Sequence, residues 1–131
     1  MASSGSGYDS FSDGAATLYN PGDLEANFLL KISLSASSSG IKITQKTNTV
    51  GQLNWSPFAA KTGDSYVIVN SKLNIIEGYD ENNIKTGNIY NEHITDGAFF
   101  AIPKGESTLT LINYSSGGYD DPSIEYNYYY I

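Results

Sequence analysis

Apolar and polar residues alternate with a period of two along much of the chain. From Phe28 every second residue as far as Leu34 is apolar, and most of the residues between them are polar. Successive side chains of a β-strand point to opposite faces, so this pattern predicts a strand with one buried face. After a break at residues 37–40, residues 41–44 alternate in the same way. The two runs together predict a β-hairpin.

Further apolar runs of the same kind follow, at residues 66–69, 73–76, 99–102, 108–112 and 124–131. Turn-forming residues separate them, such as residues 70–72 and the Asp/Asn-rich residues 80–83. We count about nine strands at the spacing typical of a β-sandwich. No window keeps the 3.6-residue period of a helix, and at most residues 94–97 could form a single helical turn. The predicted fold is an all-β, antiparallel sandwich.

Length and composition indicate one domain. The chain has 131 residues, which is one domain's worth of polypeptide. Residues 1–14 are rich in Ser and Gly and are interpreted as a flexible leader or a cloning remnant outside the fold. Residues 15–131 are then expected to form the sandwich domain.

The charge excludes nucleic-acid binding. The chain carries 14 acidic and 7 basic residues, giving a net charge of −7, and all the basic residues are lysines. Nucleic-acid binders need a concentrated positive field and favour arginine for phosphate and guanine. No apolar run approaches the ~20 residues that cross a bilayer, so membrane insertion is not expected either.

Little in the sequence points to catalysis or to a bound metal. There is no cysteine and one histidine, so disulfides and the usual zinc sites are excluded. His93 is the one plausible general base, but no nucleophile motif accompanies it, and we predict no enzyme and no cofactor. The carboxylate pairs Asp80-Glu81 and Asp120-Asp121 are interpreted as solvated turns. Calcium bound at one of these loops stays open as an alternative.

The aromatic residues are the more informative candidates for a binding surface. The chain has eleven tyrosines, five phenylalanines and one tryptophan. Four of them lie near predicted loops and are candidate contacts for a glycan or a protein: Trp55, Tyr79, Tyr90 and Tyr119. The alternative, that aromatic residues simply pack in strands and interfaces, is the stronger one, particularly for Trp55. In the last strand, Tyr126, Tyr128 and Tyr130 share one face, opposite Tyr129.

Several short segments, in order, resemble the C-terminal galectin-like domain of siphophage distal tail proteins. They are Asn20-Pro21-Gly22-Asp23 with the strand after it, the Gly63-Asp64 turn and its strand, residues 73–76, residues 99–109 with Pro103 and Gly105, and the aromatic residues 124–130. The resemblance covers about residues 16–131. Lys104, between Pro103 and Gly105, and Ser107, where asparagine is usual, depart from the family pattern.

The resemblance implies a galectin-like, jelly-roll sandwich and a structural role in the virion, at the phage tail. Distal tail proteins form a hexameric hub that joins the tail tube to the baseplate or tail tip. The ring is built by a belt domain that this sequence lacks, so a monomer or weak oligomer is expected. Production in the cytoplasm of the bacterial host and contact with other tail proteins or receptor-binding proteins are also implied.

Sugar binding of the galectin type is not implied, because the galectin clamp needs an arginine. A different function remains open as an alternative. In that reading the chain is a carbohydrate-binding module of a phage adhesion protein, and it recognises host cell-wall polysaccharide through Tyr and Trp faces.

Overall fold

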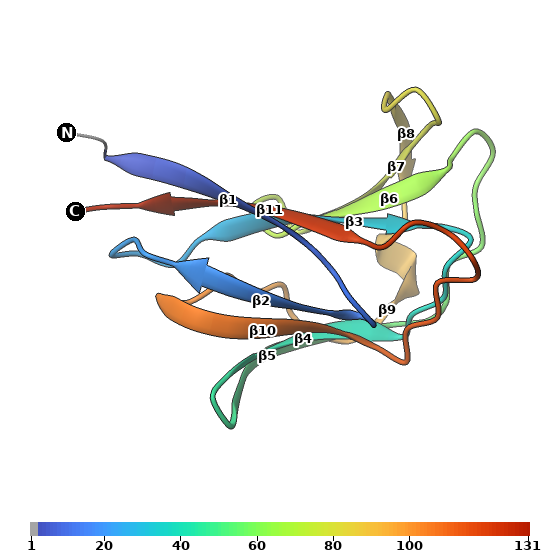
Figure 1. Cartoon of the computed structure of the whole chain (residues 1–131). Helices are drawn as coiled ribbons and strands as arrows, with labels where there is room; N and C mark the ends of the chain where they lie inside the picture. The colour runs from blue at the N-terminus through green and yellow to red at the C-terminus, as the bar shows by residue number, and fades with distance from the viewer. Residues whose placement is uncertain (1–2) are drawn as a thin grey trace.

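Two antiparallel sheets stack face to face in the computed structural model, which describes residues 3–131 (Figure 1). One sheet has six strands, in the spatial order β1 (Ser4–Ser10), β11 (Ser123–Tyr129), β3 (Asn27–Ser33), β6 (Tyr66–Asn70), β7 (Ile75–Tyr79) and β8 (Lys85–Ile89). The other has five, in the order β2 (Ala15–Asn20), β10 (Gly105–Ile112), β4 (Gly40–Gln45), β5 (Asn48–Trp55) and β9 (Ile94–Gly97). The all-β, galectin-like sandwich expected from the sequence is confirmed.

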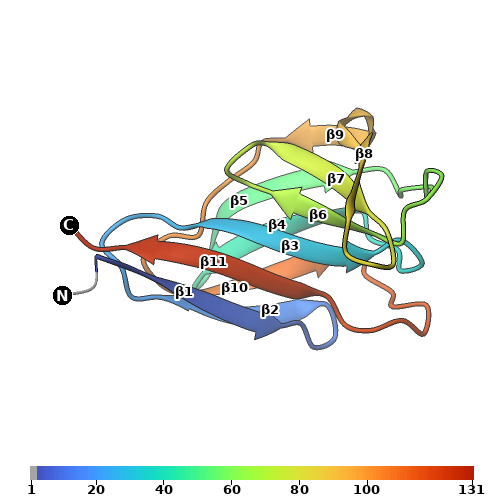
Figure 2. The same cartoon turned by 90° about the horizontal axis from the view of Figure 1, so that it is seen from above.

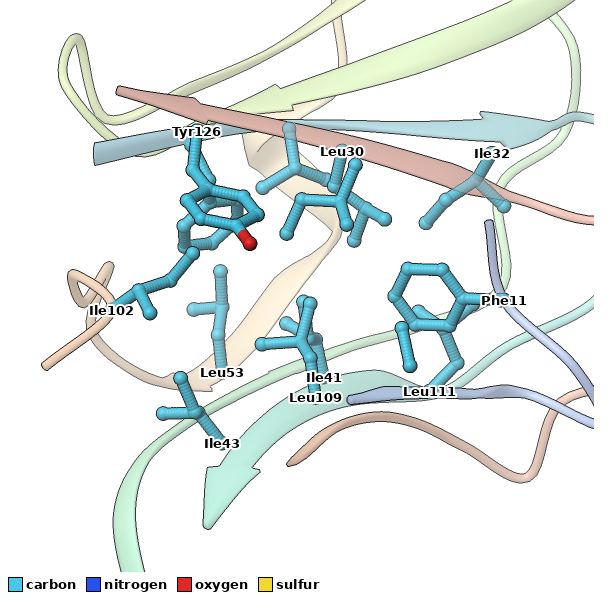
Figure 3. Close-up of a cluster of buried hydrophobic side chains, with 14 of the residues drawn as sticks. Phe11, Leu30, Ile32, Ile41, Ile43, Leu53, Ile102, Leu109, Leu111 and Tyr126 are labelled. Atoms are coloured by element: carbon cyan, nitrogen blue, oxygen red, sulfur yellow. The ribbon is translucent and has the colours of Figure 1, made fainter. Parts of the chain in front are cut away.

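The alternating pattern fills the space between the sheets. In β3, Phe28, Leu30 and Ile32 are buried, whereas Leu29 and Lys31 face solvent. Figure 3 shows Leu30 and Ile32 of the six-stranded sheet pointing towards the side chains of the opposite sheet. Burying each such side chain contributes about 1.5–3 kcal/mol, so this shared core is the main source of stability.

The predicted hairpin of residues 28–34 and 41–44 is wrong. Strand β3 pairs with β6 and β11, while β4 pairs with β5 and β10 in the other sheet. The segment between them therefore crosses from one sheet to the other. Alternation shows only which face of a strand is buried. Two consecutive alternating strands can pair with each other in one sheet or lie in opposite sheets, and both arrangements fit the pattern.

Two other predicted elements also differ. Residues 99–102 do not form a strand, and their one ladder contact is an isolated bridge between Ala26 and Ile102. Residues 94–97 form the short strand β9 instead of a helical turn, directly after the 3₁₀ turn η1 (Asn91–His93). No helix among residues 3–131 is long and apolar enough to cross a bilayer.

The Ser/Gly-rich leader is part of the fold, contrary to the sequence interpretation, apart from residues 1–2, which lie outside the described residues. Residues 4–10 form edge strand β1, paired with β11 from Ser4–Tyr129 to Ser10–Ser123. Gly5 and Gly7 face inward, and a Cβ at either would collide with the ring of Tyr128 or Tyr126. These glycines therefore make room for tyrosine rings that lie across the neighbouring strand, as aromatic side chains do over glycines in sheets.

The two ends of the described chain lie side by side. The backbone amide of Tyr130 donates to the carbonyl of Ser3 at 2.9 Å. In Figures 1 and 2 both termini lie at one end of the sandwich, and the loop between β10 and β11 lies at the other. Any neighbour joined through either terminus would thus leave that far end exposed.

Candidate functional site

A polar cleft of about 420 Å³ lies on the outer face of the six-stranded sheet. Its floor is formed by outward-facing side chains of β1, β11, β3 and β6, among them Tyr8, Lys31 and Tyr66. One wall is the end of the β10–β11 loop, residues 119–122, and the other is the β7–β8 turn with Glu81 and Asn83. We call this site the tyrosine cleft. Figure 2 shows the face of the sheet on which it lies.

The floor of the tyrosine cleft is rigidly built around Tyr66. The Lys31 Nζ lies 4.3 Å from the centre of its ring, a cation–π contact, and the ring stacks on Tyr79 with 5.3 Å between centroids. The Tyr66 hydroxyl donates to Asn83 Oδ1 at 2.9 Å. Burial, followed by the nearby Tyr79 and Asp80, raises the pKa of Tyr66. The hydroxyl is therefore a fixed donor at neutral pH.

The β7–β8 wall is shaped by Asp80. Its Oδ1 accepts hydrogen bonds from the backbone amides of Asn82 and Ile84, at 2.8 and 2.9 Å. Asn83 takes a left-handed backbone with φ of 64°, a conformation that asparagine tolerates better than most residues. The turn predicted at residues 80–83 is thus present and directs Asn83 towards Tyr66.

The opposite wall is closed by the loop before β11. Gly117 and Gly118 both have positive φ, at 61° and 87°, and turn the chain so that Tyr119 follows over the cleft. The amide of Tyr119 donates to the Ser116 carbonyl, and the Pro122 carbonyl accepts from the Phe11 amide. The buried Phe11 thereby anchors the far end of the loop to the core.

The tyrosine cleft is acidic. Glu81, Asp120 and Asp121 line it, against the single ammonium group of Lys31. Within residues 3–131 none of these three carboxylates forms an ion pair, whereas Glu77, Glu92 and Asp23 each pair with a lysine. No group of three or more His, Asp or Glu side chains in the described part of the chain is arranged to hold a metal ion.

The four aromatic residues singled out from the sequence fall into different places. Tyr119 lines the tyrosine cleft and is 55% exposed, and Tyr79 supports Tyr66 from behind. Trp55 and Tyr90 are 2% and 0% exposed, so these two contact predictions are wrong. Proximity to a loop in the sequence does not separate a ring that caps the core from one that faces solvent. Sequence reasoning missed Tyr8 because the segment that carries it was excluded from the fold.

Trp55 and Tyr90 instead hold the loop of residues 56–65 against the sandwich. Trp55 stacks on Phe58, and its indole donates to the Ser38 carbonyl at 2.9 Å. The hydroxyl of Tyr90 donates to Asp64 Oδ2. Burial and this hydrogen bond raise the pKa of Tyr90 to about 12. Asp64 also accepts from Thr86 and Asn88, which explains the Gly63-Asp64 turn as a structural feature.

The remaining motif residues are structural as well. The side chain of Asn20 is buried. Its Oδ1 accepts a hydrogen bond from the backbone amide of Gly22, and its Nδ2 donates to the carbonyls of Leu24 and Ile102. A Cβ at Gly22 would meet the Tyr129 carbonyl oxygen at 2.5 Å. Gly105 begins β10 with a φ of 92°, directly after the Pro103-Lys104 pair.

His93 lies apart from the tyrosine cleft. Its Nδ1 is 3.1 Å from Ser56 Oγ, its Nε2 is 3.8 Å from Glu92, and its ring packs edge-on against Phe58. The Ser56 amide also donates to the His93 carbonyl, so the contact joins the end of β5 to the turn before β9.

Comparison with known proteins gives one structural relative. No protein-family model and no curated protein matches the sequence. Among solved structures, the chain superposes with a TM-score of 0.65 on the crystal structure of SPP1 Dit (gp 19.1), over 97% of this chain and at 11% identity. The fold is Dit-like. SPP1 Dit is described as a paradigm of the hub adsorption apparatus in phages that infect Gram-positive bacteria, and the present chain spans 48% of its length.

Proposed function

We propose that this chain is the outer, galectin-like domain of a phage or prophage distal tail protein. In this role it decorates the hub between tail tube and baseplate or tail tip, and it docks neighbouring tail or receptor-binding proteins. The single observation that carries the proposal is the superposition on SPP1 Dit over 97% of this chain. A match of nearly the whole chain to half of a hub protein is what an appended domain of a related hub would give.

Two further observations support the proposal. The residues that resemble the distal tail family turn out to be structural: Asn20, Gly22 and Asp64 fix the turns that close the sandwich. The neighbouring termini at one end also suit a domain attached to a larger ring, with its far end free for partners.

Labelling of phage particles tests the proposal. Antibodies raised against the chain should mark the distal end of the tail in electron micrographs of particles released from cells that encode it. The same antibodies absorbed with the purified chain are the control and should leave the particles unmarked. Label on the capsid, or particles that carry none of the chain, would contradict a place in the tail hub.

The oligomeric state gives a second test. Because ring formation in the family depends on a belt domain outside this fold, the isolated chain should be a monomer or a weak oligomer. Static light scattering over a concentration series should give a mass near 14.2 kDa at low concentration. A stable hexamer at micromolar concentration would show that this fold makes a ring without a belt.

A further inference from the structure

We propose that the tyrosine cleft binds a neutral saccharide. The rings of Tyr8 and Tyr119 would stack on the C–H faces of sugar units, and the carboxylates of Asp120, Asp121 and Glu81 would accept hydrogen bonds from sugar hydroxyls. This inference goes beyond the proposed hub role and does not depend on it.

The aromatic part of the argument rests on two uncovered rings. Tyr8 is 62% exposed and Tyr119 is 55% exposed, yet both line the same cleft. Neither forms an aromatic pair within residues 3–131, whereas Tyr66 in the same cleft is held by Lys31 and Tyr79. A tyrosine ring presents an apolar, electron-rich face that attracts polarised C–H groups, and a pyranose supplies such groups on its own apolar face.

The polar part rests on solvent-exposed acceptors that no protein group bonds. Among residues 3–131, Glu81, Asp120 and Asp121 take part in neither ion pairs nor side-chain hydrogen bonds, although all three line one cleft. Saccharide hydroxyls are donors, and hydrogen bonds to an ionised acceptor are stronger than those between neutral groups. Specificity would then come from which hydroxyls reach these three carboxylates.

The charge balance disfavours an anionic ligand. Three carboxylates against one ammonium group repel phosphate and sulfate, and the whole chain carries a net charge of −7. An anionic wall polymer is therefore disfavoured. The same net negative charge would attract a lysine-rich peptide, so that peptide is included as a competitor in the test.

Size and lining also favour a saccharide over a protein segment. The volume of about 420 Å³ lies in the range of small-ligand sites, roughly 300–1,000 Å³. A stable protein interface buries about 800 Å² on each partner around an apolar core. Apart from Pro122 and the tyrosine rings, the side chains that line the tyrosine cleft carry hydroxyl, carboxyl, amide or ammonium groups.

Nuclear magnetic resonance of the ¹⁵N-labelled chain tests the proposal. The probes are neutral oligosaccharides of two to four units built from N-acetylglucosamine, glucose, galactose or rhamnose. At least one should shift the amide signals of residues 119–121, 123 and 81–83, with a Kd on the order of 1 mM as expected for a shallow site. Tyr119→Ala and Tyr8→Ala should each weaken that binding at least tenfold.

Tyr19→Ala is the matched control. Tyr19 is 61% exposed on β2 of the other sheet, so its loss should leave the affinity unchanged. A dispersed spectrum checks that each variant is folded. The proposal is overturned if no saccharide in the panel binds, if Tyr119→Ala binds as well as the original chain, or if poly(glycerol phosphate) or a lysine-rich peptide binds more tightly. None of these readouts involves the tail, so they are separate from the particle-labelling test.

Discussion

At the scale of single residues, Asn20 joins three backbone groups through one buried amide. Replacing it with aspartate keeps the shape but turns the donor that faces the Leu24 and Ile102 carbonyls into an acceptor. We expect Asn20→Asp to cost about 1–3 kcal/mol of unfolding free energy at pH 7, because buried groups are left unpaired.

The cost in Asn20→Asp should depend on pH. Burial and the two facing carbonyls would raise the pKa of the new carboxyl group above its unfolded value. The folded state then holds the extra proton, so the penalty relative to the original chain should be smallest below about pH 4 and should grow as pH rises towards 7. Urea unfolding of variant and original chain at pH 4 and pH 7 measures this, and an equal penalty at both pH values would contradict the assigned bonds.

The hydroxyl of Tyr90 gives a prediction at alkaline pH. Its pKa is raised to about 12, chiefly by burial and then by the bond to Asp64. An unfolded tyrosine titrates near 10, so the folded state binds more protons between about pH 10 and 12, and stability should fall across that window as pH rises. Tyr90→Phe should cost about 1–2 kcal/mol at pH 8 and lose part of this pH dependence.

Urea unfolding at pH 8, 10 and 11 measures the effect of Tyr90→Phe. Tyr19→Phe, on the exposed face of β2, is the control and should follow the original chain at each pH. If Tyr90→Phe had the same slope with pH as the original chain, the Tyr90 hydroxyl would not be the group that titrates.

Sequence reasoning predicted which residue type lines the cleft better than it predicted which of those residues are exposed. It identified tyrosines as the candidate contacts, and Tyr119 does line the tyrosine cleft. It could not distinguish Tyr119 from Tyr90, because both lie near predicted loop residues, and only the packing of residues 56–65 over Tyr90 decides which ring is buried.

At the scale of elements, β1 shows that composition can conceal a strand. Gly5 and Gly7 resemble linker residues, but the rings of Tyr126 and Tyr128 occupy the space that their side chains would need. Gly7→Val should therefore cost about 1–3 kcal/mol through overpacking against Tyr126. Ser6→Val, on the outward face of the same strand, is the matched control and should change stability by about 0.5 kcal/mol or less.

Urea unfolding of these two variants distinguishes a paired β1 from a loose leader. Equal stabilities of Gly7→Val, Ser6→Val and the original chain would show that residues 4–10 do not pack on β11. A larger loss in Ser6→Val than in Gly7→Val would mean that the strand is registered with the opposite face inward.

The misassigned elements share one physical cause. Residues 99–102 are apolar because they cover the core, and Ile102 is fully buried, but their backbone finds one partner at Ala26. Apolar character reports burial, whereas strand pairing depends on which distant segments lie alongside, and that information is not local. For the same reason β3 and β4 were joined in a hairpin although they belong to opposite sheets.

At the scale of the whole molecule, the candidate site is a product of topology. The tyrosine cleft combines Tyr8 of the first strand, Lys31 and Tyr66 of the middle strands and the loop before the last strand. These segments meet because β11 lies between β1 and β3, a non-consecutive order. The sandwich class follows from alternation and turn spacing, but the strand order that assembles the cleft cannot be read from either.

The shared core also predicts how the molecule unfolds. Side chains of both sheets interdigitate in one cluster, so neither sheet has a buried face without the other (Figure 3). We expect a single cooperative transition.

Trp55, in β5 of the five-stranded sheet, reports locally by fluorescence, while far-ultraviolet circular dichroism reports both sheets. The two signals should give the same urea midpoint. Gly7→Val, at the far edge of the six-stranded sheet, should then lower the Trp55 midpoint by the same amount as the dichroism midpoint. If Gly7→Val left the urea midpoint of the Trp55 fluorescence unchanged, the two sheets would unfold separately.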